Sequence, residues 1–234
     1  MKVLRIKLRA YTASFRKPQN MKIQDSFPFP PPTTIIGLFG AAMGLKHDQA
    51  LKLFENSLMG IKVNGSVAEG YDLWKIRKTD KSRKKTFKSL VKRQFYYFPE
   101  YRIYLLDDEK LLQRLYQALK TPIYALSLGR DDELITYVNP EFIEGNFITQ
   151  GEIENVLIKG TLEPGQITPS ELNNQPIKKL GVYRLTRNFQ INSRKGYRTP
   201  VGYCEYTFVN VKVEYSGELL HTQEENISLW RWVE

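Results

Sequence analysis

The chain has 234 residues, enough to bury a real hydrophobic core in one large domain or two small ones. One cysteine (Cys204) excludes an internal disulfide. The chain has only two histidines, so together with one cysteine they cannot form a usual zinc site, and we expect no metal or cofactor. A single cysteine is typical of a protein in a reducing compartment, so we expect a cytoplasmic protein. The longest apolar run has 11 residues against the ~20 of a membrane span, and the charged N-terminus lacks the apolar core of a signal peptide, so we expect no membrane contact.

The net charge of +10 is concentrated in two segments. Between Lys75 and Arg93, ten lysines and arginines accompany one aspartate, and between Lys178 and Arg198 seven stand without an acid. The rest of the chain is therefore acidic, with a net charge of −6. A run of charge is often only a solvated surface. Two such runs on an otherwise acidic protein favour the interpretation that they bind a polyanion.

Residues 3–11 alternate strictly between apolar and polar or charged side chains, which is typical of a half-buried β-strand. One face of this strand carries Leu4, Ile6, Leu8 and Ala10, and the other carries Arg5, Lys7, Arg9 and Tyr11. The sequence leaves two interpretations of the charged face open: a solvated surface, or a sheet face that binds phosphates.

A proline-rich loop over residues 27–32 precedes a predicted helix, which begins with Thr33 or Thr34 as its N-cap and runs to about Leu45. Glycines at 37, 40 and 44 indicate close backbone packing on one side of this helix. Two interpretations of the start of this helix stay open: its N–H groups bind a phosphate, or the proline loop before it is only a structural turn. Asp48 is the expected cap of a second, short helix that runs to about Leu58.

Residues 60–78 predict one or two strands with a turn at 64–65, and residues 90–106 predict another strand. Between them, residues 78–88 lack periodicity and predict an extended excursion. Asp107 is the expected cap of a helix, and residues 123–128 predict a short strand. The apolar face of that helix comprises Leu111, Leu112, Leu115, Ala118 and Leu119.

This element order, β-α-β-β-α-β, predicts an α+β fold with a ferredoxin-like domain over residues 1–130, including a basic excursion at about 75–95. Beyond residue 130 the helical signal ends and short β-rich runs alternate with prolines. We therefore expect a second, mainly β domain over residues 131–234.

No motif for nucleotide hydrolysis is present, because the glycines of 37–44 lack the spacing of a phosphate loop. The acidic clusters at 107–109 and 131–133 suit helix starts and turns better than a metal site. Neither His47 nor His221 stands in a motif for RNA cleavage. Aromatic side chains interleave with both basic segments, and that combination holds single-stranded nucleic acid.

Residues 24–44 resemble a known family. They run from Gln24-Asp25-Ser26 through the prolines to Thr-Thr-Ile-Ile-Gly-Leu and a glycine-spaced helix, which is similar to the CRISPR-associated protein five family of the RAMP superfamily. Residues 122–130, which end in Leu-Gly-Arg, and the pair Phe15-Arg16 after the first strand are also similar to that family. The resemblance covers residues 1–130, and the last hundred residues match only loosely.

The resemblance implies a subunit of a type I CRISPR surveillance complex (Cascade) in antiviral defence. Such subunits have a ferredoxin-like or RRM-like domain with a β-hairpin thumb and hold the 5′ handle of the crRNA. They cap the filament of backbone subunits beside the large subunit that reads the PAM, so the PAM-proximal target DNA is a further expected contact. The segment 75–93 lies where a thumb is inserted in this family.

One subtype of the family instead processes crRNA as a metal-independent endoribonuclease, using tyrosine, lysine and histidine. Neither His47 nor His221 matches that histidine by motif, so we expect a non-catalytic subunit; the ribonuclease is the alternative. A subunit whose charge serves only protein contacts is a third possibility. The residues expected to bind RNA are Arg5, Lys7, Arg9, Phe15, Arg16, Gln24, Ser26, Thr33, Thr34, Lys81, Arg83, Lys84, Lys85, Lys88, Arg93, Arg130, Arg184, Arg187, Arg194, Lys195 and Arg198.

Overall fold

The computed structural model describes residues 1–18, 23–65, 68–80, 85–169, 180–191 and 198–232. The described chain is α+β and mostly β. Its helices are α1 (Pro32–Met43), α2 (His47–Leu53) and α3 (Glu109–Lys120). Its strands are β1 (Lys2–Ala10), β2 (Thr12–Ala13), β3 (Ile23–Gln24), β4 (Leu58–Val63), β5 (Ala68–Asp80), β6 (Lys85–Tyr97), β7 (Glu100–Leu106), β8 (Ile135–Ile153), β9 (Val156–Lys159), β10 (Ile167–Pro169), β11 (Gly181–Ile191), β12 (Arg198–Val209), β13 (Val213–Thr222), β14 (Asn226–Ile227) and β15 (Trp230–Arg231).

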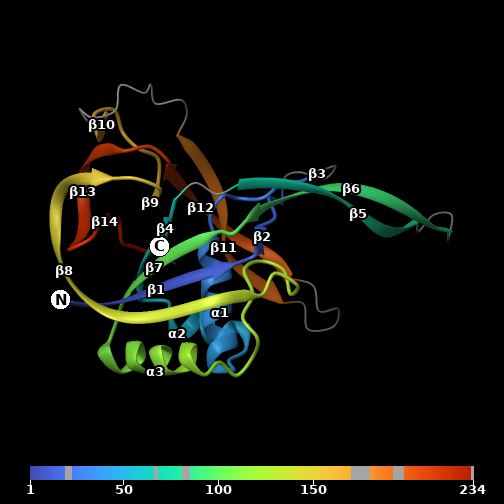
Figure 1. Cartoon of the computed structure of the whole chain (residues 1–234), viewed down its shortest axis with the longest axis horizontal. Coiled ribbons are helices and arrows are strands. Elements are labelled where there is room, and N and C mark those ends of the chain that lie inside the picture. The colour runs from blue at the N-terminus through green and yellow to red at the C-terminus, as the bar shows by residue number, and fades with distance from the viewer. Residues whose placement is uncertain (19–22, 66–67, 81–84, 170–179, 192–197, 233–234) are drawn as a thin grey trace.

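The main sheet has eleven strands, nine of them in the order β10-β13-β8-β1-β7-β4-β9-β12-β11. The predicted strand over residues 3–11 is confirmed as β1, which ends at Ala10 and pairs antiparallel with β7 and β8. The three helices pack together on one side of these central strands (Figure 1). Leu4, Ile6 and Leu8 of β1 are fully buried and share one core with the apolar faces of all three helices, because their side of the strand faces the helices.

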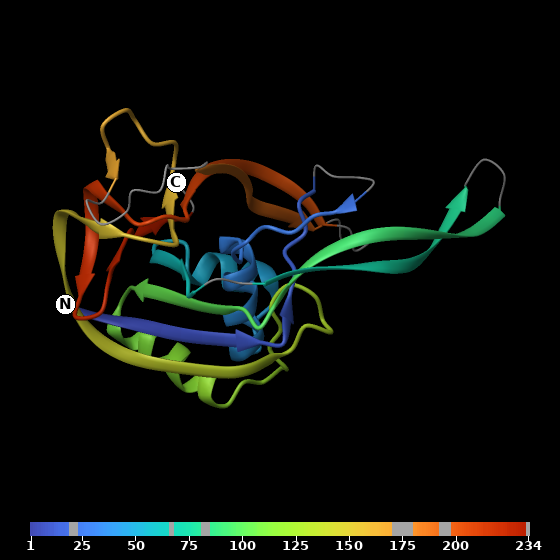
Figure 2. The same cartoon turned by 45° about the horizontal axis from the view of Figure 1, so that its top comes forward.

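A long antiparallel hairpin, β5–β6, projects from the body of the protein (Figure 2). We call residues 68–97 the arm. Its pairing is continuous from Ala68 opposite Tyr97 to Asp80 opposite Lys85, and its base is held by β2 and β3, which both pair with β6. The extended excursion expected at 78–88 is, in its described residues, the far end of these two paired strands. The far end of the arm is not covered by the body of the protein, so residues 78–88 lack the apolar alternation that reveals a half-buried strand.

The helix boundaries differ from the prediction at three caps. Helix α1 begins at Pro32, with Pro31 as its N-cap, rather than after a threonine cap, because a proline in the first turn has no N–H to satisfy. Helix α2 ends at Leu53 and has Lys46 as its N-cap, so Asp48 lies in its first turn. Asp108, not its neighbour Asp107, caps α3 by accepting hydrogen bonds from two backbone N–H groups.

The predicted strand at 123–128 is wrong. Its backbone turns onto the end of α1, where the N–H groups of Ile123 and Tyr124 donate to the carbonyls of Ala42 and Ala41 at 3.0 and 3.3 Å. These bonds satisfy carbonyl groups that a helix end leaves without partners, which competes with strand pairing. The strand that pairs with β1 is instead the first half of β8.

Strands from both sides of residue 130 share the main sheet. Strand β8 pairs with β1, and β9 and β15 pair with β4. A second core lies under the C-terminal strands and includes Ile153, Val213 and Leu220, while Tyr206 and Trp230 belong to the first core. The division into two domains stays a prediction. No helix in the described part of the chain is long and apolar enough to cross a membrane.

Candidate nucleic-acid interface

A groove of about 1290 Å³ lies where the base of the arm meets the body of the protein. Its lining comes from segments that are far apart in the sequence and that the fold brings together. The lining comes from the segments 14–18 and 24–27, from one side of α1 and the start of α2, from the base of the arm (Trp74, Arg93 and Gln94), from the segment 124–132, and from parts of β11 and β12. Eight of the residues expected to bind RNA line this groove: Phe15, Arg16, Gln24, Thr33, Thr34, Arg93, Arg130 and Arg184.

The Leu-Gly-Arg segment places Arg130 in the groove. Gly129 has a φ of +106°, and a Cβ at this position would lie 1.9 Å from the carbonyl oxygen of Ser14, so only glycine fits. The next residue stacks over an arm side chain, with the Arg130 guanidinium 4.2 Å from the ring centre of Trp74. Its Nε also donates to Asp132 at 3.1 Å, and this hydrogen bond lowers the pKa of that carboxyl.

A buried carboxylate fixes this segment from below. Glu133 is only 4% exposed, and its Oε2 accepts hydrogen bonds from the N–H groups of Ser14 at 2.9 Å and Arg130 at 3.0 Å. The Ser14 hydroxyl donates to Oε1 of the same carboxylate at 2.7 Å. Burial raises the pKa of Glu133, and the bonds from Ser14 and Arg130 oppose that shift. Glu133 therefore ties the Arg130 loop to the strand that leads into Phe15.

Two expected RNA-binding residues are instead part of the groove's foundation. Ser26 is fully buried, and its hydroxyl accepts from the N–H of Phe15 at 2.8 Å while its own N–H donates to Gln94 of the arm at 3.0 Å. Phe15 is 3% exposed and packs edge-on against Tyr101 with ring centres 5.7 Å apart. Both residues fix the base of the arm to the body, and neither offers a free side chain to a ligand.

The start of α1 also faces the groove. Thr33 and Thr34 line it, the helix has no side-chain cap, and no acid stands in the first turn. The partial positive charge at the helix N-terminus is therefore not offset by a local carboxylate. Gly37, one turn further, has open space where a Cβ would lie, so the groove comes close to the helix backbone here.

The groove is mixed in charge, with four arginines against three aspartates in its lining. Arg93 is paired with Asp72 in a two-pronged contact, and Arg130 is paired with Asp132. Among the described residues, Arg16 and Arg184 have no ion-pair partner, although the Arg184 guanidinium lies 4.6 Å from the ring centre of Tyr203. These two exposed arginines are the groove's available cations.

The arm's net charge is concentrated on one face, because the basic residues of the other face stand beside two aspartates. Cross-strand pairing puts Lys75, Arg77, Lys88 and Lys92 on the same side, with Arg77 directly opposite Lys88. Trp74, Ile76, Phe87 and Val91 share the other side. Like charges opposite one another on a hairpin are destabilising. The basic face therefore favours contact with a polyanion that neutralises it.

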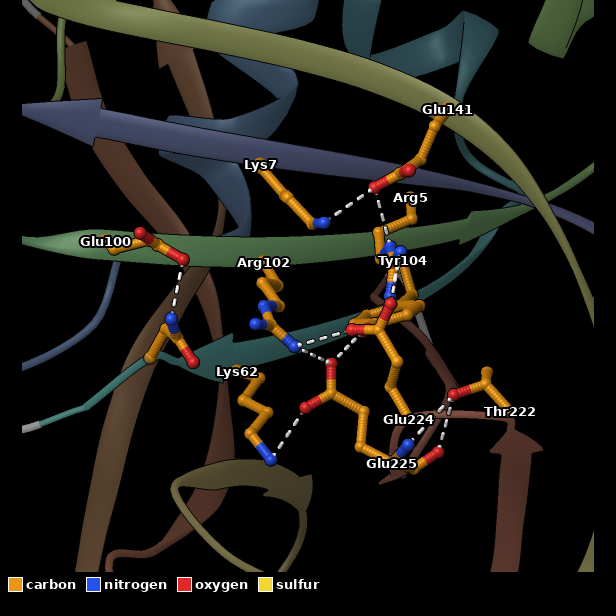
Figure 3. Close-up of polar contacts among 11 residues, drawn as sticks. Arg5, Lys7, Lys62, Glu100, Arg102, Tyr104, Glu141, Thr222, Glu224 and Glu225 are labelled. Atoms are coloured by element: carbon orange, nitrogen blue, oxygen red, sulfur yellow. Dashed lines mark hydrogen bonds and ion pairs between the residues drawn. The ribbon is translucent and has the colours of Figure 1, made fainter.

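The remaining expected residues lie elsewhere. Arg5, Lys7 and Arg9 are on the sheet face, away from the groove. Arg5 and Lys7 pair with Glu141 or Glu224 (Figure 3), and Arg9 pairs with Glu100. Arg187 is exposed on β11 but outside the groove lining. Lys81, Arg83, Lys84, Arg194 and Lys195 fall outside the described residues, as do the side chains of Lys85 and Arg198.

Sequence reasoning missed several groove residues. Trp74 was one of many aromatics in the first basic segment, and only the fold shows that it stacks with Arg130. His47 and Phe189 lie 6.0 Å apart between ring centres and both line the groove, together with Tyr124. Phe189 belongs to the aromatics that interleave with the second basic segment, but no local pattern marks His47 or Tyr124 as a groove residue. Among the described residues, no group of three or more histidines, cysteines or acids is arranged to hold a metal.

Comparison with known proteins identifies the family. A family model described as "CRISPR-associated protein (Cas_Cas5)" matches residues 3–157. The chain belongs to this CRISPR-associated Cas5 family. The match includes both similar segments, residues 24–44 and 122–130, that line or support the groove. The family expected from the sequence is thereby confirmed.

Solved structures resemble this Cas5 protein at low sequence identity, and the first of the two described here shares its fold. A CRISPR protein from Archaeoglobus fulgidus is 14% identical, with a TM-score of 0.58 over 99% of this chain and 100% of that one. A chain of a CRISPR RNA-guided surveillance complex is also 14% identical, with a TM-score of 0.48 over 91% of each chain. No curated protein matches the sequence.

Proposed function

We propose that this Cas5-family chain is a non-catalytic crRNA-binding subunit of a Cascade-type surveillance complex and that the groove holds the 5′ handle. The observation that carries the proposal is that one groove, at the junction of arm and body, presents the exposed Arg16 and Arg184 together with the ring of Trp74. Single-stranded RNA is held by this combination: cations follow the backbone, and flat groups stack on unpaired bases.

The arm is the family's thumb in this proposal. Its basic face carries Lys75, Arg77, Lys88 and Lys92 beyond the groove, so it extends the phosphate-binding surface along a strand of RNA that leaves the groove. The central strand order β8-β1-β7-β4, all antiparallel, is what a ferredoxin-like domain requires and supports that assignment for the first half of the chain.

The partners follow from the family. We propose that the chain caps a filament of backbone subunits beside the large PAM-reading subunit, close to the PAM-proximal target DNA, in antiviral defence. The guide supplies sequence recognition by base pairing, so this subunit needs no DNA-reading motif. The single cysteine suits the reducing cytoplasm in which such a complex works.

The test of the proposal is binding of handle RNA by the full chain. Replacing Arg16 and Arg184 with alanine removes the two groove cations that have no ion-pair partner among the described residues, so we expect weaker binding with unchanged folding. A matched control replaces the exposed Lys110 and Arg114 of α3, which removes the same charge on the helical side. Equal effects of the two double variants would contradict the groove assignment and leave only a general effect of charge.

The alternative is a metal-independent crRNA-processing endoribonuclease, and one observation favours it: His47 and Tyr124 both line the groove. A histidine can act as general base or acid, and a tyrosine can contribute to the same chemistry. Incubation of the purified protein with repeat RNA in EDTA separates the two functions. Cleavage that His47→Ala abolishes would establish the ribonuclease, whereas stable binding of intact RNA supports the non-catalytic subunit.

A further inference from the structure

Basic side chains from three adjacent strands form a row on the sheet face opposite the helices. Lys7 of β1 lies directly opposite Arg102 of β7, and Arg102 lies directly opposite Lys62 of β4. Arg5 stands two residues from Lys7 on the same face, and Figure 3 shows all four pointing to the same region. Like charges in such cross-strand positions repel one another, so this arrangement needs anions to hold it together.

The protein's own turn between β13 and β14 supplies most of these anions. Glu225 accepts a hydrogen bond from Arg102 and pairs with Lys62, both at 2.8 Å, while Glu224 pairs with Arg5 at 2.8 Å and with Arg102 at 3.2 Å. Glu141 of β8 completes the set, at 2.8 Å from Arg5 and 3.1 Å from Lys7. Three carboxylates thus stand against four cations over this face (Figure 3).

The turn is built to hold its carboxylates in this place. The Thr222 hydroxyl accepts from the N–H of Glu225 at 3.1 Å and donates to its carbonyl at 2.8 Å, which closes the turn. The Glu225 side chain is only 8% exposed. Burial alone would raise the pKa of Glu225, but its bonds with Lys62, Tyr104 and Arg102 outweigh burial and lower it. The carboxylate is therefore held in its charged form.

We propose that this acidic turn occupies a phosphate-binding sheet face and thereby keeps single-stranded RNA off it. The cations Arg5, Lys7, Lys62 and Arg102 have the charge and the cross-strand arrangement of an RNA-binding surface, and Glu224 and Glu225 stand where phosphates would bind. Without those two carboxylates, the face keeps four cations against Glu141 alone. RNA is directed to the groove because the competing basic surface is already neutralised.

The experiment is RNA binding by the Glu224→Gln/Glu225→Gln double variant, which removes the charges and keeps the side-chain size. The probe is a short oligouridylate, titrated against the full chain at several salt concentrations. We expect the variant to bind additional RNA relative to the wild-type protein. Three uncompensated charges at about −0.7 each give a slope near −2 for log K against log salt, so a fourfold rise in salt weakens the added binding roughly 18-fold.

The matched control is Glu154→Gln/Glu163→Gln, which changes the net charge equally at two exposed acids away from the turn. In a further variant, Lys7→Gln and Lys62→Gln are added to the first pair, and we expect this variant to lose the gain. If a folded Glu224→Gln/Glu225→Gln protein binds no more RNA than the control, the proposal is overturned.

The single variant Glu224→Gln provides the test should the double variant not fold, because this side chain is 47% exposed and Glu225 stays in place. A smaller gain of RNA binding is expected here, and no gain in folded Glu224→Gln protein overturns the proposal. Each comparison is made between variants, so it reports on the sheet face whether or not the groove binds RNA.

Discussion

Replacement of Glu133 tests whether a hydrogen-bonded link, rather than a charge, positions the Arg130 loop. Glu133→Ala leaves two backbone donors, the N–H groups of Ser14 and Arg130, without their acceptor beneath the groove. An unsatisfied buried donor costs about 1–3 kcal/mol, so we expect a loss of about 2–6 kcal/mol of folding free energy. For a chain of this length, about 2–4 °C per kcal/mol gives a fall in melting temperature of roughly 4–24 °C.

Glu133→Gln is predicted to behave differently, because both backbone donors bond to the same oxygen, Oε2. A glutamine keeps one oxygen in that position, and its amide nitrogen can donate to the Ser14 hydroxyl, which then accepts. Glutamine also relieves the burial of charge that raises the pKa of Glu133. We expect a stability change below about 1 kcal/mol, smaller than the loss of a typical buried hydrogen bond.

Thermal unfolding by circular dichroism measures both variants, and handle-RNA binding is measured well below either melting temperature. We expect Glu133→Ala to bind RNA more weakly even when folded, since the loop that carries Arg130 loses its anchor, and Glu133→Gln to bind as the wild type does. Equal damage from both substitutions would show that the negative charge matters rather than the hydrogen-bonded link. An unchanged Glu133→Ala protein would refute the positioning role.

Three further predictions concern other parts of the molecule. Gly129→Ala places a Cβ against the Ser14 carbonyl at a positive φ, so thermal unfolding should show a loss of about 2–6 kcal/mol from strain and overlap together. Because the pKa of Glu225 is lowered in the folded protein, its carboxylate stabilises the fold at pH values above its ordinary pKa of 4.5, and this stability is lost as the pH falls through the folded-state pKa. When the free energy of unfolding is measured against falling pH, Glu225→Gln should therefore show a shallower loss than the wild type. Replacing Arg77 and Lys88 with glutamine should make the slope of log K against log salt about 1.4 units less steep if both contact phosphates, and an unchanged slope in a salt titration of RNA binding would exclude the basic face of the arm.

The sequence by itself determined the family and much of the element order. The segments 24–44 and 122–130 are local patterns, and the family match over residues 3–157 confirms what they indicate. The alternation of residues 3–11 and the leucine spacing of α3 also predict β1 and the buried helix face correctly, because burial of one face imposes a period that is visible in a single strand or helix.

The arm and the strand partners of β1 depended on tertiary structure. The arm's strands are stabilised by their pairing with each other, so no buried face leaves a pattern in residues 78–88. Residues 123–128 have the composition of a strand, but the N–H groups of Ile123 and Tyr124 donate to the end of α1, and β8 takes the place beside β1. Which partner the N–H and C=O groups of such a segment bond to depends on the tertiary structure, and the local sequence does not show it.

The candidate RNA-binding groove could also be predicted only in part from the sequence. Composition alone identified basic and aromatic segments, but it could not distinguish arginines that face the groove from arginines that face the protein's own acids. Arg184 lines the groove without an ion-pair partner among the described residues, whereas Arg5 is bound by Glu141 and Glu224. Glu224 lies 219 residues from Arg5 along the chain, and only the return of the chain over the sheet brings the two charges within 2.8 Å. Whether a cation is available to a ligand is decided by its neighbours in space, because Coulomb interaction depends on distance and burial rather than on sequence position.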